Sequence, residues 1–195
     1  MVHYYDEEQT STFAPFLINI HTKKDSFKIY SASGVFSIKK LDKGSETLIN
    51  YAQPPNKGSL LDLGCGYGVV GLAIKRLYPA LDVTLSDVNE RALKLAKKNA
   101  EHLQLAVTIK KSDLFTKLGT YDCIVVNPPY VAGRKLIFSL IEQAKEHLNQ
   151  EGSLQLVARH QKGGKTLEKK MQEVFGNVTT LGKQAGFRVY KSTKN

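Results

Sequence analysis

The amino-acid sequence predicts an α/β fold: a doubly wound, mostly parallel, Rossmann-like sheet of seven strands that ends in an antiparallel hairpin. Three observations lead to this prediction. From about residue 58 onward, short apolar runs typical of buried strands alternate with longer stretches of helical periodicity. A glycine-rich segment joins the first of these strands to the first helix. The last two expected strands leave no room for a helix between them, which favours a hairpin.

The seven strands are expected in order along the chain. They span residues 59–63, 82–86, 107–110, 123–126, 153–158, 177–181 and 187–190. The final two are expected to surround turn residues, Gly182 and Gly186. Because strand and helix alternate before that point, the earlier strands are expected to be parallel.

Four helices are expected between the strands, over residues 69–77, 89–102, 136–148 and 166–175. Asn89 is a suitable N-cap for the second helix. The apolar positions at helical spacing are Leu93, Ala96 and Ala100 in the second helix, and Leu136, Leu140, Ala144 and Leu148 in the third.

The first 57 residues follow a different pattern. Residues 27–30 resemble a strand, and residues 45–51 resemble a short helix that precedes Pro54 and Pro55. This stretch is too short to form a separate domain. We therefore expect residues 1–195 to form one domain, with residues 1–57 as an N-terminal extension packed on a core of residues 58–195.

Composition and charge narrow the class of protein. With 42% hydrophobic and 24% charged residues among 195, the chain is typical of globular proteins. Its net charge of +10 is expected to attract a polyanion such as nucleic acid. The sequence contains no membrane-length apolar run, and its polar start does not resemble a signal peptide, so we expect a cytoplasmic protein without membrane contact. Cys65 and Cys123 are expected to be reduced core thiols, and the five histidines show no metal-ligand spacing.

The glycine-rich segment from Asp62 to Gly71 predicts a nucleotide-like ligand. Glycines allow a sharp turn and a close approach of the backbone, and the helix that follows offers unpaired amides. The run Gly66-x-Gly68-x-x-Gly71 matches the dinucleotide fingerprint, whereas Asp62-x-Gly64-x-Gly66-x-Gly68 matches the loop of class I methyltransferases. Asp87 ends the next strand, where a carboxylate suits ribose hydroxyls in either case. The loop alone leaves both cofactors open.

The segment Asn127-Pro128-Pro129-Tyr130 after the fourth strand favours methyl transfer. The two prolines lack amide donors, so the Asn127 oxygen and nearby carbonyls are left as acceptors beside the flat ring of Tyr130. Such acceptors suit a planar amine, whose lone pair is delocalised, and hold it in line with a methyl donor. Tyr130 is expected to stack on a base turned out of its helix. Nicotinamide chemistry does not require this arrangement.

Together these motifs resemble the class I S-adenosylmethionine-dependent methyltransferases, and more narrowly the small methyltransferase domain of ribosomal RNA guanine-N2 methyltransferases. The resemblance runs from about Gly34 to Tyr190. Besides the two motifs above, the matching segments are Gly34-Val35-Phe36-Ser37, Asp42-x-Gly44-Ser45, residues 86–92, Ser112-Asp113-Leu114-Phe115, residues 157–161 and residues 174–178. Longer members carry a second, amino-terminal domain of similar fold, and this chain is too short to include it.

The resemblance implies S-adenosylmethionine as cofactor, structured RNA as partner and a role for each matching residue. The cofactor residues are expected to be Asp62, Gly64, Cys65, Gly66, Gly68, Asp87, Val88, Asp113, Leu114 and Asn127. The target base is expected to contact Asn127, Pro128, Pro129 and Tyr130, and the RNA to contact Phe36, Arg134, Arg159, Lys162 and Lys165. Within these sets, Asp87 would hold the ribose and Asp113 the adenine amino group. No metal is expected, since the sulfonium carries its own leaving group.

Two other functions remain open at this stage. Enzymes that methylate a protein glutamine share the Asn-Pro-Pro-Tyr segment, because an amide nitrogen is an equally poor nucleophile. The basic charge favours an RNA methyltransferase over a protein glutamine methyltransferase, as does the lack of a helical substrate-recognition domain. A ribosome-assembly factor that binds the cofactor with little catalysis is the third reading, but it leaves the acceptors at Asn127 without a use.

Overall fold

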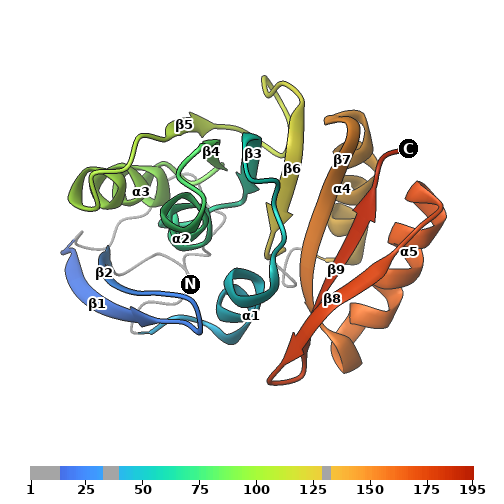
Figure 1. Ribbon diagram of the computed structural model, residues 1–195, viewed down its shortest axis with the longest axis horizontal. Coiled ribbons are helices and arrows are strands. Elements are labelled where there is room, and N and C mark those ends of the chain that lie inside the picture. Colours follow the sequence, from blue (N-terminus) through green and yellow to red (C-terminus); the bar gives the residue numbers. More distant parts are fainter. Residues whose placement is uncertain (1–13, 33–39, 129–132) are drawn as a thin grey trace.

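The computed structural model describes residues 14–32, 40–128 and 133–195, and contains a seven-stranded sheet with helices on both faces (Figure 1). The strands of this sheet are β3 (Gly58–Leu63), β4 (Leu81–Asp87), β5 (Thr108–Lys111), β6 (Tyr121–Val126), β7 (Leu148–Arg159), β8 (Thr179–Gln184) and β9 (Phe187–Thr193). The helices are α1 (Lys43–Tyr51), α2 (Val69–Leu77), α3 (Glu90–His102), α4 (Arg134–Glu146) and α5 (Lys165–Phe175), with a short π-helical turn, η2 (His160–Gly164). None of the helices in these ranges is long and apolar enough to span a membrane.

The strand order is β5-β4-β3-β6-β7-β9-β8. Strands β5, β4, β3, β6 and β7 are parallel to their neighbours, whereas β9 lies antiparallel between β7 and β8. The predicted doubly wound sheet with a C-terminal antiparallel hairpin is confirmed. All of the parallel strands therefore end at one side of the sheet, which we call the carboxyl end.

Alternation along the central strands divides the apolar core between the two faces of the sheet. On β3, Leu60 faces α1, α2 and α3, whereas Leu61 and Leu63 face α4 and α5. On β6, Cys123 and Val125 share the first face. Side chains that fill both faces explain why these strands read as continuous apolar runs rather than as alternating ones.

Helix α2 has the bounds that the sequence predicts, and Asn89 caps α3 as expected, since its Oδ1 accepts from the amide of Ala92 at 3.1 Å. Helix α4 differs from its prediction. It begins at Arg134 and ends at Glu146, so Leu148 is the first residue of β7 rather than part of the helical stripe. The buried stripe of α4 is Ile137, Leu140, Ile141 and Ala144, and Leu136 is only half-buried.

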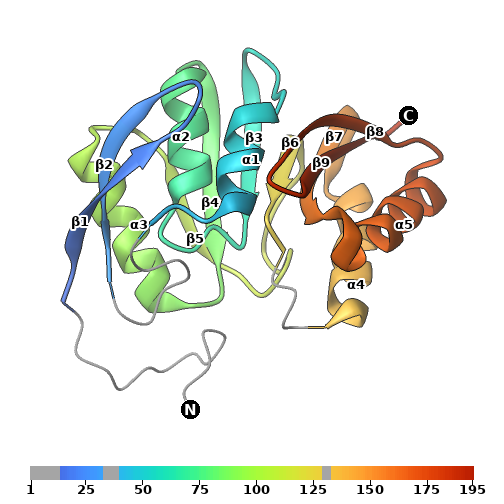
Figure 2. The same ribbon diagram turned by 90° about the horizontal axis from the view of Figure 1, so that it is seen from below.

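The N-terminal part forms a hairpin of β1 (Phe16–His21) and β2 (Ser26–Ser31), followed by α1. Strand β1 was not predicted. Its buried residues, Ile18 and Ile20, alternate with exposed ones. The hairpin lies beside α3, and α1 lies between it and β8 and β9 (Figures 1 and 2).

Gly182 is not a turn residue, contrary to the sequence prediction; it lies within β8, and Ala185 and Gly186 form the turn. A Cβ at Gly182 would overlap the ring of Tyr51 on α1. The Tyr51 hydroxyl accepts from Lys23 Nζ at 2.8 Å, which restrains the ring. Gly182 is therefore needed for α1 to pack against the sheet.

Replacing Gly182 with Ala is expected to destabilise the protein, because the new methyl group forces Tyr51 and α1 away from β8. Overpacking of this kind costs about 1–3 kcal/mol. Urea unfolding measures the difference, with Gly119→Ala as the matched control, because a Cβ at Gly119 has no atom within 4 Å. Equal stability of the two variants would show that α1 has room to shift.

Candidate functional site

Five of the segments singled out in the sequence meet at the carboxyl end of the sheet. The glycine loop follows β3, Asp87 ends β4, Asp113 follows β5, Asn127 follows β6 and Arg159 ends β7. Parallel neighbours bring these ends together, and β3 pairs with both β4 and β6. In doubly wound sheets this is the end at which ligands bind.

The glycine loop adopts a backbone that only glycine takes readily. Gly64, Gly66 and Gly68 have φ angles of +68°, +57° and +87°. A Cβ at Gly64 would meet no atom within 4 Å, so the loop is open to an approaching ligand at that point. Cys65, between these glycines, donates its amide to Ser86 O at 2.9 Å, which continues the pairing of β3 with β4. Its buried thiol forms no disulfide and donates to Gly66 O at 3.4 Å, and burial raises the pKa of the thiol well above its usual value.

Asp62 holds the loop from beneath. Its Oδ2 accepts from the amide of Gly71 at 2.8 Å, so it joins the end of β3 to the first turn of α2. The side chain is 2% exposed. Burial raises the pKa of Asp62 to about 7, the Gly71 amide opposes this shift, and the nearby Asp87 adds to it.

Asp87 supports the loop from β4. Its Oδ2 accepts from Gly66 N at 2.8 Å and its Oδ1 from Asn89 N at 2.9 Å. Each carboxylate oxygen can still accept another hydrogen bond, so binding of ribose hydroxyls stays a prediction. The segment after β5 adjoins this residue, since Ser112 N donates to Asp87 O at 3.1 Å. Next to it Asp113 is exposed, whereas Leu114 and Val88 are half-buried.

Asn127 lies at the tip of β6, directly before the buried Pro128. Its Nδ2 donates to Asp42 Oδ1 at 3.2 Å and to Ser45 Oγ at 3.1 Å, both at the start of α1. The contact between these three residues was not predicted, although the segment that contains Asp42 and Ser45 matched the family pattern. Three of the predicted site residues, Pro129, Tyr130 and Phe36, lie outside the described residues.

The four predicted RNA-contacting residues that the structure describes are exposed at the same end of the sheet. Arg134 begins α4, Arg159 ends β7, Lys162 lies in η2 and Lys165 begins α5. The backbone of η2 is held by His160, whose Nδ1 lies 2.7 Å from the Tyr190 hydroxyl. This contact keeps the basic segment folded back against β9.

A buried asparagine that was not predicted as a site residue links the loop to the N-terminal hairpin. Asn99 of α3 donates to Tyr67 O at 3.0 Å and to Tyr30 O at 2.9 Å, and accepts from Tyr30 N. It is fully buried. A polar residue within the apolar stripe of a helix is the signal that could have identified it.

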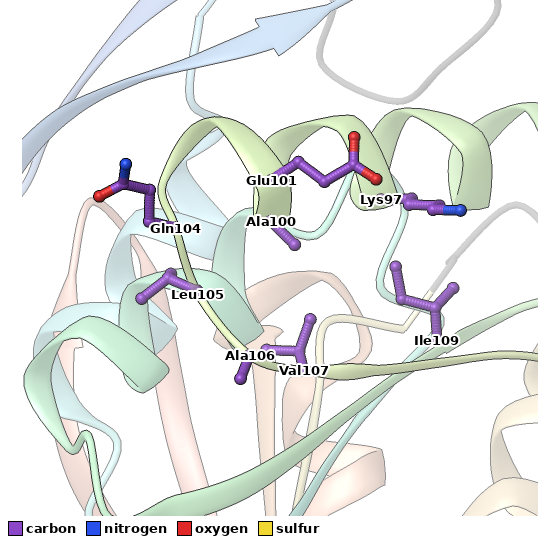
Figure 3. A pocket seen from close by; sticks show the side chains of 8 residues that line it. All are labelled: Lys97, Ala100, Glu101, Gln104, Leu105, Ala106, Val107 and Ile109. Atoms are coloured by element: carbon purple, nitrogen blue, oxygen red, sulfur yellow. The ribbon is translucent and has the colours of Figure 1, made fainter.

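A cavity of about 510 Å³ lies between α3 and the segment that enters β5 (Figure 3). Leu105, Val107 and Ile109 provide apolar lining, and Lys97 and Glu101 of α3 add charge. Because Leu105 and Val107 precede β5, the cavity opens near the amino end of that strand. It is separate from the carboxyl end, where the predicted site residues meet.

Comparison with known proteins points to one family. The family described as "Methyltransferase small domain" matches residues 26–191. The "Uncharacterized protein YbxB" of Bacillus subtilis (strain 168) is 34% identical, over 98% of each chain. "Ribosomal RNA small subunit methyltransferase C" of Haemophilus influenzae (strain PittEE) is 37% identical over 90% of this chain and 53% of its own length.

Among solved structures, the fold matches "T. Thermophilus 16S rRNA N2 G1207 methyltransferase (RsmC) in complex with AdoMet and Guanosine". The TM-score is 0.80 at 25% identity, covering 95% of this chain and 52% of that one. The chain therefore spans about half the length of the RNA methyltransferases that it matches.

The raised pKa of Asp62 predicts a pH-dependent effect of Asp62→Asn, which retains an oxygen for the Gly71 amide. Since the folded pKa is about 7 and the usual value is 3.8, the stabilising effect of the protonated carboxyl is complete below pH 3.8 and is lost as the pH rises to 7. The free energy of unfolding of the wild type, relative to the variant, should therefore fall between these pH values.

Denaturant unfolding at several pH values measures this difference, with Asp122→Asn as the control of opposite sign. Hydrogen bonds from Ser59 and Asn149 lower the pKa of Asp122, so its contribution should be lost as the pH falls below 3.8. A constant difference between wild type and Asp62→Asn would contradict the raised pKa.

Proposed function

Because the chain belongs to the methyltransferase small domain family, we propose that it transfers a methyl group from S-adenosylmethionine to the N2 amine of a guanine in structured ribosomal RNA. The observation that carries the proposal is the position of the Asn127 amide, at the tip of β6 beside the glycine loop of β3. The similarity to a ribosomal RNA small subunit methyltransferase over 90% of the chain supports it.

The residues at the carboxyl end suit S-adenosylmethionine. The open face of Gly64 leaves room for the methionine part, and the carboxylates of Asp87 and Asp113 are acceptors for ribose hydroxyls and an adenine amino group. When bound, this cofactor supplies an electrophilic methyl group, whose bonding pair leaves with sulfur as the new carbon–nitrogen bond forms. Asp62 acts on the cofactor only indirectly, by holding the loop through Gly71.

The role that we assign to Asn127 is to make the target amine, a weak nucleophile, more reactive. Its Oδ1 accepts from one N–H of the amine, which keeps lone-pair density on nitrogen and aligns it with the methyl group. Pro128 has no amide donor to compete for that oxygen. We assign stacking of the base to Tyr130, and release of the surplus proton to water.

The basic residues around this end would hold the RNA. Asn127 follows β6, and β7 is the strand paired with β6. Four exposed basic residues lie near the carboxyl ends of these two strands: Arg134, Arg159, Lys162 and Lys165. With a net charge of +10, the chain attracts the negatively charged phosphate backbone. Binding should therefore weaken as salt rises. Action on ribosomal RNA implies work in the cytoplasm.

The direct test incubates the protein with methyl-labelled S-adenosylmethionine and unmodified ribosomal RNA, free and in subunits, and then digests the RNA to nucleosides. Label in N2-methylguanosine supports the proposal. Label in a protein glutamine would instead indicate a protein glutamine methyltransferase. Cofactor binding without any label would favour a ribosome-assembly factor.

Asn127→Ala is expected to lower the rate of methyl transfer by about 10²- to 10⁴-fold, because the acceptor that aligns the amine is lost. The dissociation constant of S-adenosylmethionine, measured by calorimetry, should change far less than the rate, because the other nine expected cofactor residues are retained. Asn149→Ala is the matched control: Asn149 donates to Asp122 at the amino end of β7, far from the reaction. Full activity of Asn127→Ala would show that this side chain does not bind the amine.

A further inference from the structure

The start of α1 contacts the amide of Asn127, although the two segments are more than 80 residues apart in sequence. Asp42 is the N-cap of α1, and its Oδ1 accepts from Gly44 N at 2.9 Å and Ser45 N at 3.0 Å. The same oxygen accepts from Asn127 Nδ2, and Ser45 Oγ lies 3.1 Å from that nitrogen. A helix cap and the proposed catalytic asparagine thus share one carboxylate oxygen.

These contacts fix which way the amide faces. Asp42 Oδ1 already accepts from the amides of Gly44 and Ser45, so the side of Asn127 that faces this oxygen must be its NH₂ group. The two donors of that group match the two acceptors, Asp42 Oδ1 and Ser45 Oγ. A flipped amide would place two acceptor oxygens against each other. The Asn127 Oδ1 is therefore directed away from Asp42.

Gly44 packs closely against the same amide. A Cβ at this position would lie 3.0 Å from Asn127 Oδ1, 3.1 Å from its Nδ2 and 3.0 Å from Asp42 Oδ1. Carbon contacts that short are tighter than ordinary van der Waals contact, so an alanine at position 44 would push the amide aside. The absence of a side chain at Gly44 thus lets the amide lie where the two acceptors hold it.

The second carboxylate oxygen of Asp42 is consistent with a ligand that binds next to Asn127. Asp42 Oδ2 is buried and makes no hydrogen bond among the described residues. An unpaired buried carboxylate oxygen is unfavourable, and such groups in folded proteins call for an explanation. An N–H group of a bound substrate would supply the missing donor.

We propose that Asp42, Gly44 and Ser45 are positioning residues that orient the Asn127 amide, so that its Oδ1, and not its NH₂, faces the target amine. The inference rests on the proposed function, in which Asn127 accepts from that amine. A rotated amide would set donors against donors, and the amine would lose its alignment. The N-terminal segment thereby contributes to the chemistry through Asn127.

Gly44→Ala and Ser45→Ala test the proposal through a split between kinetic constants. Both are expected to lower kcat, Gly44→Ala by about 10²-fold, since a small displacement of a positioned group has effects of that size. The dissociation constant of S-adenosylmethionine should stay within about twofold of the wild type. Gly119→Ala is the matched control, because a Cβ there is in open space. Unchanged kcat in both variants would overturn the proposal.

A double-mutant cycle separates positioning from a general structural effect. If Gly44 and Ser45 act through Asn127, their substitution in an Asn127→Ala background should lower the single-turnover rate no further. The same loss in both backgrounds would overturn the proposal, because it would place the effect elsewhere.

The side-chain amide signals of Asn127 in ¹⁵N NMR spectra give a readout that needs no RNA. Ser45→Ala and Asp42→Ser should shift these signals; Ser retains an N-cap oxygen but is too short to reach Asn127. If the wild type fails to methylate RNA, the proposed function fails, and the amide signals still decide the geometry. Signals that stay unchanged in both variants would overturn the positioning role.

Discussion

Two buried carboxylates hold the glycine loop to the sheet, and the arrangement of the site depends on them. Asp62 accepts from Gly71 and Asp87 accepts from Gly66, so two amides of the loop are fixed by side chains from adjacent parallel strands. Each of these side chains is almost fully buried, and a buried polar group is tolerated only when it is hydrogen-bonded. The loop is therefore held at Gly66 and Gly71 and is open at Gly64, where a Cβ would meet no atom within 4 Å and a ligand can approach.

The proposed site combines two parts of the chain that lie far apart in sequence. The sheet provides the glycine loop and Asn127, while the start of α1 provides the acceptors that orient the Asn127 amide. Other buried polar contacts tie these parts together. Asn99 joins the loop to β2, and Gln155 of β7 bonds both the amide and the carbonyl of Gln53. The N-terminal segment thus contributes contacts to the proposed site as well as to the packing.

Local signals in the sequence were sufficient for most of the fold. The apolar run of β3, its glycines and the cap at Asn89 depend on near neighbours, and each was predicted where the structure has it. The features that were missed depend on distant residues. Whether Gly182 makes a turn or leaves room for Tyr51 is decided by a helix 130 residues away, and strand β1 has apolar residues exposed on one side. The contact between Asp42 and Asn127 likewise could not be predicted from local sequence, because the two residues are 85 positions apart.

The position of β9 also affects how the chain reaches its folded state during synthesis. This strand is the last one described, yet it lies inside the sheet, between β7 and β8. Until residue 193 has left the ribosome, β7 lacks one hydrogen-bonding neighbour and α1 lacks part of the surface on which it packs. Non-local pairing of this kind slows folding and leaves a strand edge exposed. A nascent chain should therefore complete this side of the sheet, and the packing of α1 on it, only after β9 has been synthesised.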